Sequence, residues 1–353
     1  MKQELLRTVT TVALAAALQA CSAEDPPPSG ASSAGASAGG TSALGGGSST
    51  AGSPSAAGTS ALPSGGTASS SGGTANAGGN AGGAAASSGA ASSAGAGTTG
   101  GSTGTGATKS AGCGVTDPLA SGTATIDVSG TLREYILKVP DGYDANTPYK
   151  LIFGWHWRGG KASDVSGGQI GGGPYYGLEK LAKGTAIFVS PNGIDNGWAN
   201  TGGRDITFLK ALLALINSKL CIDQSRIFST GFSYGGMMSN TIGCEMADVF
   251  RAIAPMSGAL YSGCTKSNTQ PIAVWMSHGT GDDVVPLADG KAALDVFLKK
   301  NGCGTQTTAV TPTPCVAYQG CSAGHPVNYC EFDGKHSAPS FASSAVWQFF
   351  SQF

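Results

Sequence analysis

The chain has 353 residues, 57 of them glycine, and a formal net charge of −1 at pH 7. Its Lys and Arg residues form no cluster and no basic helix, which argues against a nucleic-acid-binding protein. The length would suit two domains, yet residues 26–108 contain no charged and no aromatic side chain. Such a stretch cannot bury enough apolar surface to offset its ordering entropy. We therefore expect a flexible low-complexity linker over 22–112 and one folded domain over 113–353.

The first 21 residues predict an export signal. A charged start is followed by an apolar run over 9–18 that is too short to span a bilayer. Cys21 follows small residues, as in bacterial lipoprotein signals, in which the cysteine becomes lipidated. The alternative is an ordinary secretory signal cut near Ala20 or Ala23. Either way we expect an exported protein, lipid-anchored at the cell surface or outer membrane or secreted, with no other membrane contact.

The remaining cysteines all fall in the predicted domain, at positions 113, 221, 244, 264, 303, 315, 321 and 330. An even number of cysteines in an exported domain predicts up to four disulfides, whose pairing the sequence leaves open. No C-x-x-C pair and no histidine spacing favours zinc. We expect neither a metal nor another cofactor.

The predicted domain alternates strands with helices. Strands are expected at 123–128, 132–139, 150–155, 185–190, 226–230, 252–256, 272–277 and 327–332. Helices are expected at 178–183, from Asp205 to before Cys221, after 235, and at 288–300 and 341–350. In the second helix Asp205 is expected to act as the cap, and five apolar residues share one face: Ile206, Leu209, Leu212, Leu213 and Ile216. The alternation predicts an α/β fold with a mostly parallel sheet covered on both faces, and functional groups beyond the carboxyl ends of its strands.

Residues 231–235 read Gly-Phe-Ser-Tyr-Gly between a predicted strand and a predicted helix. This is the context of a G-x-S-x-G nucleophile elbow, in which a strained turn exposes the serine hydroxyl. Gly231 and Gly235 supply the missing Cβ atoms that the turn needs. Chance is the alternative in a chain so rich in Gly and Ser, but this copy lies outside the linker. Ser233 is therefore our predicted nucleophile.

A serine nucleophile needs a base, and the base needs an acid that orients it. Asp282 follows the strand at 272–277, with its neighbour Asp283 as the second choice; both could instead only cap the loop before the next helix. His336 follows the strand at 327–332 and precedes the last helix. The chain order Ser233, Asp282, His336 is that of the α/β-hydrolase fold.

The other three histidines are less suited to the base. His156 and His278 each close a strand before a glycine-containing loop, and His325 precedes a strand, at the opposite end of the sheet. We therefore expect His336 to be the general base.

An oxyanion needs preorganised N–H donors. One is expected from the backbone of Tyr234, at the start of the helix that follows the nucleophile. The second is expected from Trp157, in the Gly-rich loop after the strand at 150–155, with Arg158 as its alternative. This loop could also be only a turn.

Several aromatic residues fall in loops at the predicted carboxyl edge: Trp155, Trp157, Tyr175, Tyr176, Trp198 and Tyr234. They could line an acyl or sugar pocket, or they could simply pack in the core. We expect substrate contacts from His156, Arg158, Tyr176 and Trp198.

The motifs together resemble the secreted esterases of carbohydrate esterase family 1, which include feruloyl esterases, acetylxylan esterases and polyhydroxybutyrate depolymerases. The segments that carry the resemblance are 156–160 (His-Trp-Arg-Gly-Gly), 191–193 (Pro-Asn-Gly), 197–198 (Gly-Trp), 203–205 (Gly-Arg-Asp), 231–236 (Gly-Phe-Ser-Tyr-Gly-Gly) and 278–286 (His-Gly-Thr-x-Asp-x-x-Val-Pro). The resemblance covers about residues 130–350. One departure is Lys335, because many members have glycine directly before the catalytic histidine.

The resemblance implies an α/β-hydrolase fold and a monomeric serine esterase with the triad Ser233, His336 and Asp282. It implies feruloyl esters of plant cell-wall polysaccharide as the first substrate, with acetylxylan or a polyester as alternatives. A protein of another class, a non-catalytic surface-binding lipoprotein on a hydrolase fold, is the further alternative. The presence of all three triad residues argues against it.

Overall fold

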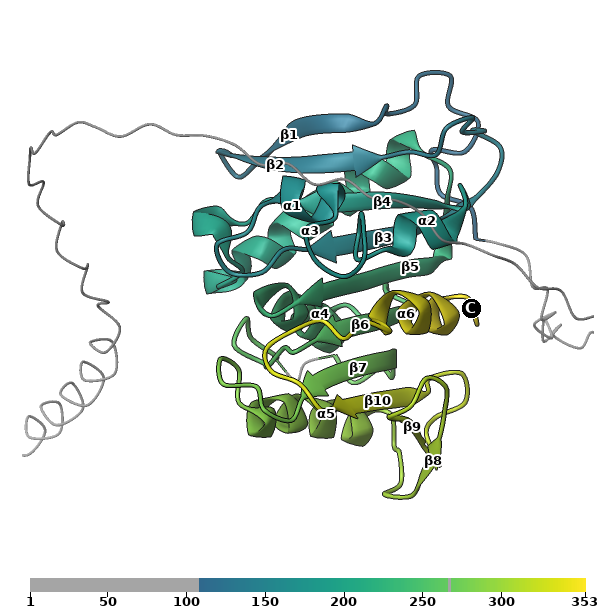
Figure 1. The fold of residues 1–353 in the computed structure, drawn as a ribbon. Helices are drawn as coiled ribbons and strands as arrows, with labels where there is room; N and C mark the ends of the chain where they lie inside the picture. Colours follow the sequence, from purple (N-terminus) through teal and green to yellow (C-terminus); the bar gives the residue numbers. More distant parts are fainter. Residues whose placement is uncertain (1–107, 266–267) are drawn as a thin grey trace, which may run out of the picture. The chain divides into compact units, whose positions relative to one another are not determined.

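The computed structural model of this protein describes residues 108–265 and 268–353 (Figure 1). The export signal, Cys21 and nearly all of the expected linker lie outside the described residues. The strands are β1 (Gly122–Val128), β2 (Thr131–Lys138), β3 (Tyr149–Trp155), β4 (Ala186–Pro191), β5 (Ile222–Phe232), β6 (Ala252–Met256), β7 (Ala273–Gly279), β8 (Thr307–Ala309), β9 (Cys315–Tyr318) and β10 (Val327–Phe332). The helices are α1 (Ala162–Gly167), α2 (Leu178–Ala182), α3 (Arg204–Lys219), α4 (Tyr234–Glu245), α5 (Leu287–Lys300) and α6 (Ala342–Phe350), with 3-10 turns η1 (Ile194–Asn196) and η2 (Thr201–Gly203).

All the strands belong to one sheet, in the order β1-β2-β4-β3-β5-β6-β7-β10-β9-β8. Every pairing from β4 through to β10 is parallel. The outer strands pair antiparallel, β1 and β2 at one edge and β9 and β8 at the other. The loops after β3, β5, β7 and β10 therefore open at the same edge of the sheet, where ligands bind in such folds.

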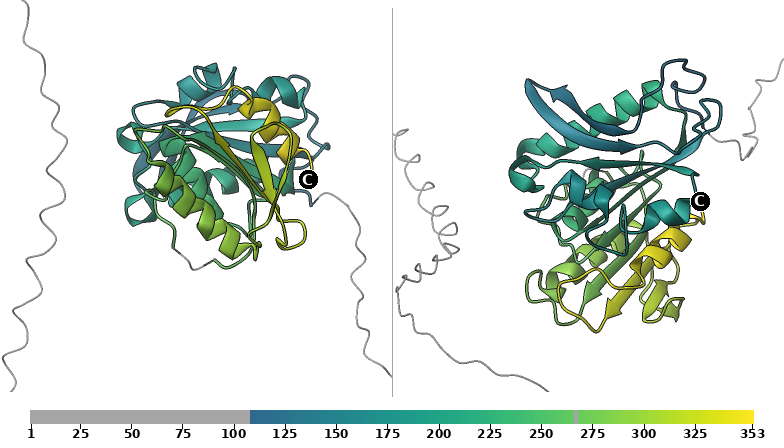
Figure 2. Two further views of the ribbon diagram at one scale, coloured as in Figure 1. Left: turned by 60° about the horizontal axis from the view of Figure 1, so that its bottom comes forward. Right: turned by 45° about the horizontal axis from the view of Figure 1, so that its top comes forward.

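Helices cover both faces of this sheet, as Figures 1 and 2 show. One apolar cluster joins α3, α4 and α5 to one face, and a second joins α1, α2 and α6 to the other. The five predicted apolar residues of α3 are all buried in the first cluster. The predicted α/β-hydrolase architecture, a central parallel sheet between two helical layers, is confirmed.

The start of α3 differs from the expectation. Its N-cap is Gly203, and Asp205 lies inside the first turn, fully buried against Arg133 of β2. The capping contacts come from Asn200, whose Oδ1 accepts the amide N–H groups of Asp205 (3.1 Å) and Ile206 (3.2 Å). Asp205 does not cap the helix because its carboxylate binds Arg133 Nη2 and the Asn200 amide, both at 2.8 Å.

The domain begins before residue 113. Lys109 forms a β-bridge with Asp223, and the Ser110 hydroxyl donates to Leu220 O (2.6 Å) and accepts from the Ile222 amide (2.8 Å). These contacts put the end of the expected linker a few residues earlier than 112. Short elements that the sequence pattern did not predict are α1, β8 and β9.

The eight domain cysteines form four disulfides, Cys113–Cys221, Cys244–Cys264, Cys303–Cys321 and Cys315–Cys330. The expected number is confirmed, and it supports an exported protein, because disulfides persist in oxidising compartments. Within 108–265 and 268–353, no helix has the length and apolarity needed to cross a bilayer.

Candidate active site

The turn from β5 into α4 holds Ser233 in a backbone conformation that is rare for a side-chain-bearing residue, with φ 56° and ψ −118°. Such strain costs of order 1–3 kcal/mol and needs close support from its surroundings. A Cβ on Gly231 would lie 2.5 Å from the Gly235 carbonyl, and a Cβ on Gly235 would lie 2.0 Å from Trp155 O. Both glycines therefore permit the approach of α4 to the sheet, as the elbow motif predicts.

The three residues predicted for catalysis meet at this turn. The Ser233 hydroxyl lies 2.8 Å from His336 Nε2, and His336 Nδ1 lies 2.8 Å from Asp282 Oδ2. Because a carboxylate only accepts, the Nδ1 atom carries the proton and leaves Nε2 free to accept from the hydroxyl. The geometry is that of a base aligned between a nucleophile and an acid.

Neighbouring parallel strands supply this arrangement. Ser233 follows β5, Asp282 follows β7 and His336 follows β10, and these strands share one carboxyl edge. The Asp282 side chain is fully buried, whereas His336 keeps 13% of its surface exposed. The carboxylate is therefore out of water, where its attraction to a charged imidazole is strongest.

The second-choice acid lies elsewhere. Asp283 is exposed and forms an ion pair with Lys335 at 3.2 Å. Lys335, the residue that departs from the family pattern, is itself exposed. The pKa of Asp283 lies below its usual value because Lys335 donates a hydrogen bond to its carboxylate.

The two amides predicted for the oxyanion lie on adjacent segments. Tyr234 is the first residue of α4, where the amide N–H has no partner within the helix. Trp157 follows β3, the strand beside β5, and its carbonyl accepts from His156 Nδ1 (2.7 Å) and from the Gly160 amide (3.1 Å). These bonds fix the backbone around Trp157.

His156 connects this loop to the next one along the edge. Its Nε2 accepts the Gly193 amide at 3.0 Å, so Nδ1 is the protonated nitrogen that donates to Trp157 O. Its carbonyl accepts Trp198 Nε1 at 2.8 Å. Burial lowers the pKa of His156, which keeps the ring neutral, as both of its hydrogen bonds require.

The expected substrate contacts need correction. The side chains of His156, Tyr176 and Trp198 are buried, with exposed fractions of 0%, 2% and 0%. Their polar atoms bind backbone groups, and the Tyr176 hydroxyl donates to Trp155 O and accepts the Phe232 amide. In this structure they position the loops and do not face a substrate. Arg158 is exposed and stays a predicted contact.

A positioning residue that the sequence reading missed is Asn200. It ties the start of α3 to the loop after β6, because its Nδ2 donates to Ser262 O at 3.1 Å. Its backbone is left-handed, with φ 49°, a conformation that Asn adopts more readily than most residues. The position of Asn200 in an Asn-rich loop just before a predicted helix could have indicated this capping role.

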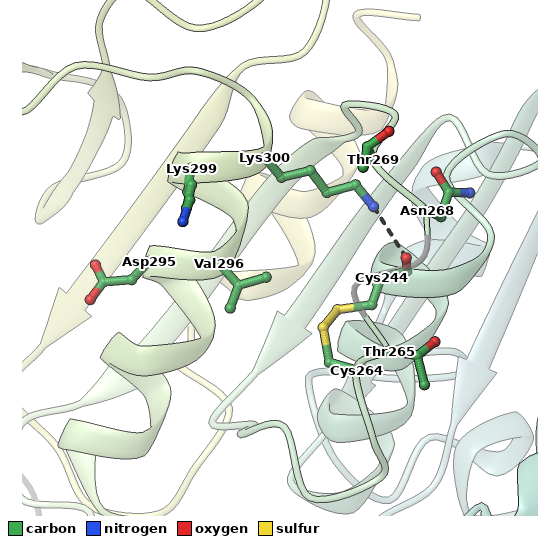
Figure 3. A pocket seen from close by; sticks show the side chains of 9 residues that line it. All are labelled: Cys244, Cys264, Thr265, Asn268, Thr269, Asp295, Val296, Lys299 and Lys300. Carbon is green, nitrogen blue, oxygen red and sulfur yellow. Dashed lines mark hydrogen bonds between the residues drawn. A yellow bond between two sulfur atoms is a disulfide. The ribbon is translucent and has the colours of Figure 1, made fainter.

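A cavity of about 440 Å³ lies away from the triad, between the last turns of α4 and α5 (Figure 3). It lies beside the Cys244–Cys264 disulfide, and Lys300 crosses it to donate to Cys244 O and Gly243 O. Ser233 precedes the first turn of α4, so the cavity is at the opposite end of that helix. Among the residues that the structure describes, no group of three or more His, Cys, Asp and Glu could hold a metal ion.

The strand order, the elbow and the contacts of Ser233, His336 and Asp282 define an α/β-hydrolase. A family model described as the prolyl oligopeptidase family matches residues 194–296, a part that contains Ser233 and Asp282 but not His336. An acetyl xylan esterase from Aspergillus awamori shares the fold, with a TM-score of 0.52 at 16% identity over 65% of this chain and 99% of that one.

Curated relatives are closer in sequence. Feruloyl esterase C of Emericella nidulans is 44% identical over 229 residues, which cover 62% of this chain and 83% of that protein. Feruloyl esterase D of Neurospora crassa is 40% identical over 249 residues, which cover 65% of this chain and 86% of that protein. The chain belongs to the feruloyl esterase family and is a carboxylic ester hydrolase, which confirms the resemblance read from its motifs.

Proposed function

We propose that this protein is an exported serine esterase that cleaves feruloyl esters of plant cell-wall polysaccharide, with Ser233 as nucleophile, His336 as general base and Asp282 as the acid. The single observation that carries the proposal is the position of His336, whose two ring nitrogens lie 2.8 Å from Ser233 Oγ and from Asp282 Oδ2.

In the first half of the reaction, Ser233 Oγ attacks the ester carbonyl carbon while His336 Nε2 takes the hydroxyl proton. Asp282 keeps Nδ1 protonated and stabilises the imidazolium. The backbone N–H groups of Tyr234 and Trp157 donate to the oxyanion of the tetrahedral intermediate. His336 then protonates the leaving alcohol, and an acyl-enzyme remains.

Water completes the cycle by the same route. His336 takes a proton from the water as it attacks the acyl carbon, and returns the proton to Ser233 when the carboxylic acid leaves. His336 therefore takes part in every proton transfer of the cycle.

Two observations support an aromatic acyl group. Both relatives described above are named feruloyl esterases. In addition, the side chains of Tyr261 and Val284 are 59% and 64% exposed on the loops after β6 and β7. The Val284 amide donates to Asp282, and the Tyr261 hydroxyl donates to Asp289 at the start of α5. An aromatic ring packed on Val284 would bury apolar surface next to Asp282, and Tyr261 offers a second exposed ring on the loop after β6.

The test is a substrate panel of methyl ferulate, acetylated xylan and polyester film, run with the original protein and with Ser233→Ala. We expect ferulate release to be fastest, and Ser233→Ala to lose at least about 10³-fold in kcat/KM. Ser337→Ala, which alters an exposed serine next to His336, is the matched control and should keep its activity. Tyr261→Ala should raise KM for methyl ferulate more than for an acetyl ester.

Two outcomes would contradict the proposal. Full activity of Ser233→Ala would remove the nucleophile assignment. Faster release of acetate from xylan, or erosion of polyester without release of ferulate, would show that the substrate assignment is wrong. The assignment of the triad would not be affected.

For the localisation, we propose lipidation at Cys21 followed by attachment to the cell surface through the lipid, with the catalytic domain acting as a monomer. The short apolar run before Cys21 supports this proposal. Metabolic labelling with a fatty acid should mark the original protein and not Cys21→Ser. If both are released unlabelled, the protein is secreted.

A further inference from the structure

A second histidine contacts the proposed catalytic acid. His278, in β7, is buried, and its Nε2 lies 2.9 Å from Val285 O and 3.3 Å from Asp282 Oδ2. A carbonyl oxygen only accepts hydrogen bonds, so Nε2 must carry a proton. That proton is donated to Val285 O, and the carboxylate oxygen that accepts from His336 lies within ion-pair distance of the same nitrogen without forming a hydrogen bond to it.

The other side of the His278 ring is closed. Its Nδ1 has no hydrogen-bond partner among the described residues, and it faces Gly290 in the first turn of α5. A Cβ on Gly290 would lie 2.2 Å from Nδ1. A proton on Nδ1 would therefore find no acceptor, which agrees with the tautomer that carries its proton on Nε2.

The carboxylate of Asp282 is thus held from two sides. Its Oδ1 accepts the amides of Val284 (3.0 Å) and Val285 (2.8 Å). Its Oδ2 accepts from His336 Nδ1 and lies 3.3 Å from His278 Nε2. Rotation of the carboxylate would break all of these contacts together, which fixes the direction in which Oδ2 meets His336 Nδ1.

We propose that His278 is a positioning residue for the reaction: its Nε2–H holds the Val285 carbonyl and thereby the turn whose amides orient Asp282, and through Asp282 it sets the orientation and tautomer of His336. The inference rests on the proposed triad. A core histidine with only a packing role is the alternative. A buried Nδ1 without a partner lowers stability, and an apolar side chain at this position would avoid that cost. A role in packing alone would therefore favour a hydrocarbon. What histidine adds here is the hydrogen bond that Nε2 donates.

The test compares His278→Leu with His278→Gln on p-nitrophenyl acetate, a substrate that does not depend on the feruloyl assignment. His278→Leu removes the donor, and we expect kcat to fall about 10- to 100-fold with KM changed less than about 3-fold. The side-chain amide of Gln can donate from nearly the position of Nε2, so His278→Gln should return kcat to within about 5-fold of the original. Retention of kcat in the Leu variant, or equal losses in both variants, would overturn the proposal.

A second pair of variants keeps the histidine in place. Gly290→Ala pushes on Nδ1 and should lower kcat by displacing the ring. Gly243→Ala also presses on α5, because its Cβ would lie 2.9 Å from the Phe297 ring, but it does not touch His278. Similar losses of stability with a drop in kcat only for Gly290→Ala support the proposal, and equal kcat in the two variants contradicts it.

Asp282→Asn is run beside them as the reference. If it lowers kcat while His278→Leu does not, the inference on His278 alone fails. If Asp282→Asn also leaves kcat unchanged, the proposed triad fails first.

Discussion

Two adjacent carboxylates, Asp282 and Asp283, differ entirely in their surroundings. The Asp282 side chain is fully buried and contacts His336, whereas the Asp283 side chain is 62% exposed and pairs with Lys335. Exposed ion pairs of that kind contribute only about 0–1 kcal/mol. The chain thus offers a matched pair of variants at neighbouring positions.

We predict that Asp282→Asn lowers kcat about 10³- to 10⁴-fold, because an amide can donate to Nδ1 and select the wrong tautomer of His336. Asp283→Asn should stay within about 3-fold of the original protein. Steady-state kinetics on one ester at fixed pH measure both. If Asp283→Asn proved the more damaging, the acid would have to be reassigned.

His156 provides a prediction on pH at the same scale. Its pKa is lowered in the folded protein by burial. As the pH falls, His156 therefore takes up its proton in the unfolded chain before it does so in the folded protein. The stabilisation from neutral His156 is complete above the unfolded pKa of about 6.5. It is lost as the pH falls through the lower folded pKa.

We expect the unfolding midpoint of the original protein to fall more steeply below about pH 6.5 than that of His156→Gln. The glutamine at position 156 does not titrate in this range. His325→Gln is the comparison: burial also lowers the pKa of His325, but its side chain is only partly buried, so its effect on the pH curve should be smaller. Parallel pH curves for the original protein and His156→Gln would show that this histidine is not the source of the acid sensitivity.

At the scale of elements, the close approach of α4 to β3 depends on Gly235. A Cβ there would meet Trp155 O at 2.0 Å and His156 O at 2.9 Å, both backbone atoms that cannot rotate away. We predict that Gly235→Ala destabilises the protein by about 1–3 kcal/mol and lowers kcat, because α4 and the loop after β3 must separate. Urea unfolding and kinetics on the soluble fraction measure the two effects.

Gly167→Ala is the control for that substitution. Gly167 ends α1, and a Cβ on it has nothing within 4 Å. Replacement by Ala should leave stability unchanged or raise it slightly. If Gly235→Ala were equally harmless, the elbow would be looser than its contacts indicate.

The elements that the sequence predicted well carry their own signal. The five apolar residues of α3 repeat with helical spacing, and the elbow combines a buried strand, two required glycines and a helix. Short polar segments such as α1 and the exposed strand β8 have no such period. Contacts with other parts of the chain determine where such short elements form. The strand β9 is an example, because its Cys315 is bonded to Cys330 of β10.

The same reason separates the predicted site residues that the structure brings together from those that it corrects. Ser233 is predicted from a local motif. Asp282 and His336 are predicted from their positions just after expected strands and from their order along the chain. Whether Trp198 faces a substrate or the core depends on the backbone of His156, which a local pattern does not contain. Likewise Asp205 has the residue type of a cap, but Arg133 on β2 determines its burial.

Over the whole molecule, the disulfides enclose chain segments of very different length. Cys113–Cys221 spans 108 residues and links the first described segment to the start of β5. Cys303–Cys321 spans 18 residues that include β8 and β9. Constraining a longer loop removes more entropy from the unfolded chain, so the first bond should contribute more to stability although each is a single covalent link.

We predict that replacing both cysteines of the 113–221 pair by serine lowers the free energy of unfolding by about 4.8 kcal/mol, against about 3.2 kcal/mol for the 303–321 pair. Urea titration of the two double variants at neutral pH measures the difference. The 113–221 bond lies beside the start of β5, at the opposite end of this strand from the elbow. Folded protein of either variant should for that reason keep its kcat, and equal losses of stability would contradict the loop-entropy argument.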